Sequence, residues 1–142
     1  MSELAADLQD ALGDLAIQPG DVVLVRTGWP QVYGDPQRYI GHTDGAPGVT
    51  IDGAEWLADR GVRAAGCDTI AFDQIRPGAG HNHMPAHVVL LVQHGIHIIE
   101  VLNLEELAAS GVREFLFVMV PLRIVGATGS PVRPLAIANL KQ

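Results

Sequence analysis

Three short apolar runs that alternate with helical patterns most constrain the fold of this chain. The runs "VVLVRT" (22–27), "VRAAGCDTIAFD" (62–73) and "IHIIEVL" (96–102) each predict a strand. The first interval contains a helical pattern at 50–61, with Thr50 as N-cap, and the second contains one that begins at Pro85 and ends near His94. Because strand and helix alternate in this way, the sequence indicates an α/β domain.

The remaining segments extend this pattern at both ends. Leucines at helical spacing predict a helix over 3–16, and a long Gly- and Pro-containing segment at 28–48 is typical of a loop that covers a site. After the third strand we expect a short helix capped by Asn103. A long strand (113–124), a turn (126–131) and a last strand (132–140) follow.

Size and composition limit the class of protein. A chain of 142 residues suits a single domain, and 48% apolar residues with a mean hydropathy of +0.22 suggest that another subunit covers one face. No apolar run approaches the roughly 20 residues that span a bilayer. The net charge of −7 argues against a nucleic-acid partner. The single cysteine, Cys67, and the acidic start of the chain, which lacks secretory-signal features, fit a reducing cytoplasm.

Glu100 is the most unusual residue, because it lies inside the apolar run "IHIIEVL". A buried carboxylate must be paired, neutralised or bound to a metal. His87 lies in the preceding helix, and a helix packed on its own next strand brings such residues together. Imidazole plus carboxylate suits zinc or manganese, but zinc requires at least three protein ligands. A plain histidine–glutamate hydrogen bond under a loop is the alternative.

Other polar residues have simpler interpretations. His83 should precede the helix, because Pro85 favours a helix start after it, and the remaining histidines fit loops or the surface. Asp68 and Asp73 follow a strand, where they would bind a cation, orient a base or cap the turn. Arg26 and Arg123 lie in apolar strands and need acidic partners, of which Glu100 is one candidate.

Four stretches, read in order, resemble the cyclase family of metal-dependent hydrolases, which includes bacterial kynurenine formamidase and isatin hydrolase. They are "GDVVLVRTGW", "APGVTIDGAEWLADRGVRAAGCDTIAFD", "AHVVLLVQHGIHIIEVLNLEEL" and "VPLRIVGATGSPVRPLAI". The match corresponds to the second half of a family member. It implies a partial swivelling β/β/α domain over 1–142, with a mixed sheet flanked by helices, that is usually dimeric. Family members open amide bonds in formylated anilines or cyclic amides with a divalent metal.

The resemblance also assigns roles to individual residues. It implies that His87 and Glu100 are metal ligands for Zn²⁺ or Mn²⁺. Trp29, Pro47 and Gly48 fall where the family shapes its substrate pocket. Three further positions match recurrent family positions with supporting roles: Asp68, Asp73 and Ser130.

One family segment does not occur in the printed sequence. Family members carry H-x-G-T-H-x-D-x-P-x-H before "GDVVLVRTG", and it supplies most metal ligands and the acid/base histidine. A companion chain would supply this segment in a split enzyme. Alternatively, the chain is a non-catalytic cyclase-like protein that binds a ligand or partner, or it rebuilds a metal site from its own residues: His81, His83, His87 and Glu100.

Taken together, the sequence predicts a cytoplasmic subunit of a metal-dependent amidohydrolase. Its expected partners are a small-molecule amide substrate and either the companion chain or a second copy of itself. Nucleic acid and membranes are not expected partners.

Overall fold

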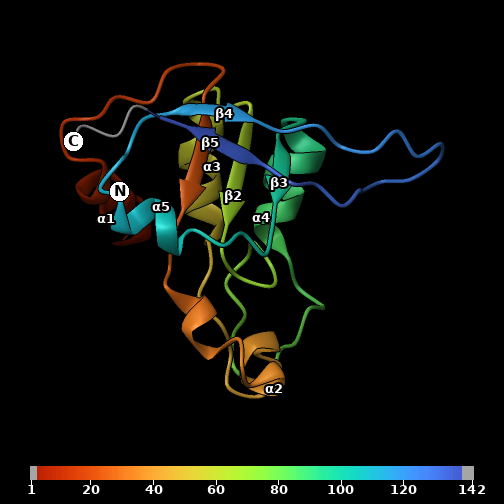
Figure 1. Ribbon diagram of the computed structural model, residues 1–142. Helices are drawn as coiled ribbons and strands as arrows, with labels where there is room; N and C mark the ends of the chain where they lie inside the picture. Colours follow the sequence, from red (N-terminus) through yellow and green to blue (C-terminus); the bar gives the residue numbers. More distant parts are fainter. Residues whose placement is uncertain (1–2, 139–142) are drawn as a thin grey trace. The chain divides into compact units, whose positions relative to one another are not determined.

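The computed structural model describes residues 3–138, whose contacts form two compact units, one ending at Asn103 and the other beginning at Leu104 (Figure 1). A single domain over 1–142 stays a prediction. No helix within the described range is long and apolar enough to cross a membrane.

Three parallel strands form the sheet of the first unit, in the order β1-β2-β3. They are β1 (Val22–Val25), β2 (Ala64–Cys67) and β3 (His97–Ile99). The central strand, with sequence Ala-Ala-Gly-Cys, is buried along its whole length. A Cβ added at Gly66 would lie 2.7 Å from the side chains of both Leu24 and Leu102, so this position has no room for a larger residue. The α/β alternation predicted from the sequence is confirmed.

Helices cover the face of this sheet that carries Ala65 and Cys67. They are α1 (Glu3–Leu12), α3 (Ile51–Asp59), α4 (Pro85–His87) and the π-helix η2 (Val88–Gln93). Leu57, Phe72 and Leu90 are fully buried at the centre of this core. Apolar side chains at helical spacing therefore meet the small residues of β2, which allows close packing of helix on sheet.

The predicted helices are present, although α1 ends at Leu12 and not at residue 16, and two other helices differ locally. Thr50 is the N-cap residue of α3, but its hydroxyl bonds the Asp52 carboxylate instead of a backbone N–H. The helix that begins at Pro85 changes to π geometry after one turn. The hydrogen bond at its end spans five residues, because the His94 N–H donates to the Val89 carbonyl at 3.2 Å. Gly95 ends it with a φ of 64°.

The long segment at 28–48 is more ordered than expected. It contains a 3₁₀-helix, η1 (Trp29–Val32), and a short helix, α2 (Pro36–Ile40), whose N-cap Asp35 accepts the Arg38 N–H at 3.1 Å. Two isolated bridges, Ala46 with Ile75 and Val49 with Asp73, then join its end to the segment that follows β2.

The second unit contains α5 (Glu105–Ala109) and an antiparallel pair, β4 (Leu116–Val118) and β5 (Leu135–Ile137). The N-cap of α5 is Leu104, so the prediction for Asn103 was wrong. Of the long strand predicted at 113–124, only Leu116–Val118 is a strand, and the rest of that prediction is wrong.

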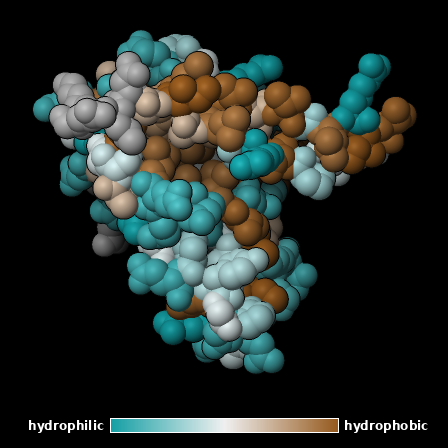
Figure 2. Space-filling model, viewed as in Figure 1, coloured by the Kyte–Doolittle hydropathy of each residue, from teal (hydrophilic) through white to brown (hydrophobic). Residues whose placement is uncertain are grey.

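The chain between β4 and β5 does not pair as a strand. Pro121 has no N–H to donate to a ladder, and the Leu122 N–H donates to the Ser130 hydroxyl at 2.8 Å instead. Apolar side chains in this segment are exposed, with Val120 at 76% and Val125 at 95%, and Figure 2 shows the segment largely in brown. Of the last predicted strand (132–140), only Leu135–Ile137 pairs, as β5, and residues 139–140 lie outside the described residues.

Candidate functional site

Polar residues gather where the three parallel strands end. Thr27 follows β1, Asp68 directly follows β2 and Glu100 directly follows β3. This carboxyl edge is where open α/β sheets place their binding sites.

Glu100 does not lie inside a strand, and this corrects the sequence analysis. Strand β3 ends at Ile99, and the Glu100 side chain is 34% exposed. Val101 then adopts a φ of 57°, which is rare for a β-branched residue and turns the chain away from the sheet. Its N–H donates to the Thr69 carbonyl at 2.9 Å. The carboxylate is therefore a partly exposed group at a strand end. It is not buried inside the sheet, so the sequence argument that burial requires a partner does not apply to it.

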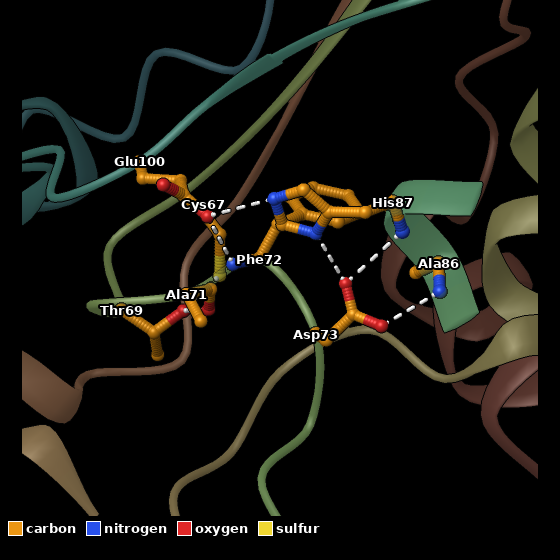
Figure 3. Close-up of polar contacts among 8 residues, drawn as sticks. All are labelled: Cys67, Thr69, Ala71, Phe72, Asp73, Ala86, His87 and Glu100. Atoms are coloured by element: carbon orange, nitrogen blue, oxygen red, sulfur yellow. Dashed lines mark hydrogen bonds and ion pairs between the residues drawn. The ribbon is translucent and has the colours of Figure 1, made fainter. Parts of the chain in front are cut away.

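His87 and Glu100 nevertheless face each other (Figure 3). Nε2 of His87 lies 3.4 Å from Oε1 of Glu100. The same Glu100 oxygen accepts the backbone N–H of Phe72 at 2.9 Å. The predicted proximity of these two residues is confirmed.

Asp73 holds His87 from the opposite side of the ring. Its Oδ2 lies 2.6 Å from Nδ1 of His87 and accepts the His87 backbone N–H at 3.1 Å, while its Oδ1 accepts the Ala86 N–H at 2.6 Å. The Asp73 side chain is 1% exposed. One buried carboxylate thus caps the start of α4 and orients the imidazole, as Figure 3 shows.

The two carboxylates set the protonation of the imidazole. Hydrogen bonds with Asp73 and then Glu100 raise the pKa of His87 to about 9, against the opposing effect of burial. Burial raises the pKa of Glu100, but the hydrogen bonds from His87 and from the Phe72 N–H outweigh it, so this pKa lies below its ordinary value. Without an ion, His87 is an imidazolium between two carboxylates at neutral pH.

The donor atoms also fit a divalent ion. Nε2 of His87 and Oε1 of Glu100 are 3.4 Å apart, and two atoms so spaced, each about 2.1 Å from one ion, enclose an angle of about 108° at it. That angle is close to tetrahedral. Asp73 on the second ring nitrogen is the partner that metal-bound histidines usually have. The two donors therefore fit a zinc or manganese ion as part of a larger ligand set.

Asp68 forms a separate network from Asp73. It is fully buried and accepts hydrogen bonds from the Thr27 N–H, the Thr27 hydroxyl and the Gly28 N–H, at 2.6 to 3.0 Å. It therefore joins the end of β2 to the loop after β1, instead of capping its own turn. Sequence reasoning missed Thr27, although its place after β1 was a usable signal.

Trp29 and Pro47 line a shallow cleft of about 280 Å³, together with other residues of the two bridged loops: Asp44, Gly45, Ala46, Gln74 and Ile75. The Trp29 indole N–H donates to the Tyr39 carbonyl at 3.0 Å, and the Tyr39 hydroxyl donates to the Asp68 carbonyl at 3.0 Å. Gly48 is not among the lining residues and packs on Asp73 instead. Sequence reasoning missed the polar lining residues Asp44 and Gln74.

The other predicted residues lie elsewhere. His83 precedes α4, as expected, and the histidines outside this helix are exposed. Cys67 is a buried core residue, as predicted. Arg26 and Arg123 are exposed, so neither is the buried strand charge that the sequence suggested. Ser130 lies in the second unit, where its hydroxyl bonds the backbone.

A metal site rebuilt from this chain alone is not formed. Within residues 3–138, no three His, Cys, Asp or Glu side chains are grouped so that they could hold one ion. The arrangement of His81, His83, His87 and Glu100 considered above is therefore wrong. His81 instead packs against His42, with ring centroids 4.7 Å apart.

Comparisons with known proteins identify relatives in both sequence and fold. Isatin hydrolase of Roseibium aggregatum is 30% identical over 124 residues, which cover 85% of this chain and 46% of that protein. A crystal structure of a novel cyclase superposes with a TM-score of 0.80 at 30% identity, over 94% of this chain and 46% of that one.

A second solved structure, described as a potential metal-dependent hydrolase with cyclase activity, is 31% identical, with a TM-score of 0.58. It is matched over 89% of this chain and 55% of its own length. The chain thus spans about half the length of the relatives it matches. The cyclase family model matches residues 3–74, half of the chain, a range that includes Thr27, Asp68 and Asp73 but not His87 or Glu100. With its sequence and its fold both matched in this way, the chain belongs to the cyclase family.

Proposed function

We propose that this chain is one half of a metal-dependent amide hydrolase, in which His87 and Glu100 are two ligands of a divalent ion, Zn²⁺ or Mn²⁺. The observation that carries the proposal is the 3.4 Å approach of Nε2 of His87 to Oε1 of Glu100, backed by Asp73 on the other ring nitrogen. The relative described as a potential metal-dependent hydrolase supports the same class of reaction.

The chain's own residues hold and orient the donors. Asp73 accepts the Nδ1 proton, which leaves Nε2 as the donor atom that faces Glu100. The Phe72 N–H fixes Oε1 of Glu100. A bound divalent ion would polarise an amide carbonyl and lower the pKa of water. The remaining ligands and the base that moves the proton would come from a companion polypeptide with the H-x-G-T-H-x-D-x-P-x-H segment, or from a second copy of the chain.

The substrate class follows from the cleft and from the relatives. Trp29 offers a flat aromatic wall, and Asp44 and Gln74 offer hydrogen-bond acceptors for an amide or aniline N–H. Isatin hydrolase, by its name, opens a cyclic amide. We therefore expect small aromatic formamides or cyclic amides as substrates. A cytoplasmic location would fit the single buried thiol.

The test is metal retention in the assembled protein. The chain is co-expressed with a companion polypeptide that carries the H-x-G-T-H-x-D-x-P-x-H segment, and bound zinc and manganese are measured after purification. His87→Gln and Glu100→Gln should each lower metal occupancy and abolish amide hydrolysis while the far-UV CD spectrum is unchanged. His97→Gln, which alters an exposed histidine on β3, is the matched control and should retain both. Full metal occupancy in the double variant would overturn the assignment.

The second candidate function is a non-catalytic, cyclase-like protein that binds a ligand or a partner. The observation that favours it is the small donor set, because His87 and Glu100 are two donors where zinc requires at least three. A chain that purifies alone, free of metal, and binds an aromatic amide at the Trp29 cleft without turnover would support this function. Its binding would then be insensitive to His87→Gln.

A further inference from the structure

We infer that one dipeptide, Phe72–Asp73, positions both candidate ligands, and that Gly48 is the residue that holds this dipeptide in place. The inference rests on the proposed function for its metal but on the structure alone for its geometry. Phe72 donates its backbone N–H to Glu100 at 2.9 Å, and Asp73 holds the His87 ring at 2.6 Å. Figure 3 shows these contacts reaching the two ligands from adjacent residues.

The dipeptide is fixed to the preceding loop through backbone hydrogen bonds. The Val49 N–H donates to the Phe72 carbonyl at 2.7 Å, and the Gln74 N–H donates to the Val49 carbonyl at 3.1 Å. Val49, Phe72 and Asp73 are all buried. The carbonyl side of Phe72 is thus bound to one segment while its N–H is bound to Glu100, so a shift of the dipeptide moves both ligands.

Gly48 makes the close approach of these segments sterically feasible. A Cβ at this position would overlap the carbonyl carbon and oxygen of Asp73 and lie 2.6 Å from the Gln74 nitrogen. The φ of Gly48 is not in the left-handed region, so the requirement for glycine here is one of space and not of backbone conformation. Because the clashing atoms are backbone atoms, the Asp73 backbone must move if a methyl group is added.

This changes the role that the sequence suggested for Gly48. The residue does not line the cleft, yet it controls the 3.4 Å separation of the ligands through a chain of contacts: Gly48 with Asp73, Asp73 with His87, and Phe72 with Glu100. Gly48 and Asp73 are therefore positioning residues that act on the metal through others.

The test compares Gly48→Ala with Gly34→Ala in the full chain. A Cβ at Gly34 meets nothing within 4 Å and its φ is not left-handed, so this control carries the same change in chain entropy without the clash. Amide hydrogen exchange measures, without any metal, how well the hydrogen bonds of the Phe72 and Ala86 N–H groups are kept. Exchange at the Phe72 and Ala86 amides should rise about tenfold or more in Gly48→Ala. The Leu102 amide, which donates to the Cys67 carbonyl at 3.1 Å, serves as a reference and should change little.

A titration of the assembled protein with Zn²⁺, followed by the ring C–H signals of His87, measures binding at the candidate ligands. Gly48→Ala should raise the midpoint about tenfold, and Asp73→Asn should raise it about 10- to 100-fold. Asp73→Asn keeps the side-chain volume and remains informative if Gly48→Ala fails to fold. Its amide has a single acceptor oxygen, so it cannot serve the Ala86 N–H and the His87 ring together.

The outcomes separate the two proposals. Equal exchange at Phe72 and Ala86 in the two glycine variants would overturn the positioning role of Gly48, whatever zinc does. If exchange rises as expected but zinc does not shift His87 in the unaltered assembled protein, the positioning role stands and the metal assignment fails. A midpoint unchanged by Asp73→Asn would overturn the role of Asp73.

Discussion

The His87 ring and the Glu100 carboxylate face each other across 3.4 Å, one from the helix α4 and the other from the end of the strand β3. Without an ion, the proton on Nε2 occupies the space between them, and the pKa of His87 is about 9. A metal ligand must lose that proton. The proton and the divalent ion therefore compete for the same pair of atoms.

The stability of the metal-free chain should depend on the charge of His87. The pKa of His87 is raised from 6.5 to about 9, so its contribution to the free energy of unfolding is complete below pH 6.5 and is lost as the pH rises through 9. The loss between these two pH values should be about 3 kcal/mol, since one pKa unit corresponds to about 1.4 kcal/mol. Urea unfolding at pH 6.5 and pH 9.5, with a chelator present, measures it. In His87→Gln this fall should be absent, and an equal fall would show that another group causes it.

Asp68 should matter for stability more than an exposed acid. Asp68→Ala would leave two backbone N–H groups and the Thr27 hydroxyl without their acceptor. The expected loss in the free energy of unfolding is about 3 kcal/mol. Asp44→Ala, at an exposed position, should change stability by less than about 0.5 kcal/mol. Equal effects of the two substitutions in urea unfolding would contradict the role of the Asp68 network.

Val101 should tolerate glycine unusually well. Its φ of 57° is strained for a β-branched residue, by about 1–3 kcal/mol, and glycine removes that strain. We expect Val101→Gly to raise the melting temperature. Val92→Gly, in the last turn of η2 and 78% exposed, should lower it, because glycine weakens a helix. A fall of similar size in both variants would show that Val101 is not strained.

The Cys67 thiol should be inert in the folded chain. It is fully buried, and burial raises its pKa, so little reactive thiolate is present. Reaction with a disulfide reagent should be slower than in urea by about two orders of magnitude or more. Rapid labelling of the native chain would indicate that the structure around the carboxyl end of β2 opens readily.

The sequence was sufficient to predict the alternating core but not its exact boundaries. Gly95, Pro85 and Thr50 mark helix ends by local chemistry, and the structure places helix ends at or beside these residues. The run "IHIIEVL" gave no sign that β3 stops at Ile99, because the reversal depends on a left-handed Val101 whose N–H is bound by Thr69, a residue of the loop after β2. Beyond β4, the Leu122 N–H bonds the Ser130 hydroxyl, a contact that no local pattern in the sequence predicts.

The candidate site was predicted only in part, for the same physical reason. Residue types and resemblance led to His87 and Glu100, and the structure brings them together. The contact of Asp73 with His87 was not predicted, because spacing along the chain does not determine which residue a buried carboxylate contacts. The role of Gly48 also depends on the approach of two backbones, which the sequence does not encode as a pattern.

The most direct measurement is anomalous diffraction at the zinc edge from crystals of the assembled protein grown with Zn²⁺. The expected result is a peak within about 2.1 Å of both Nε2 of His87 and Oε1 of Glu100. An assembled protein that hydrolyses its amide with zinc bound elsewhere, and with His87 still hydrogen-bonded to Glu100, would contradict the assignment of these two residues as metal ligands.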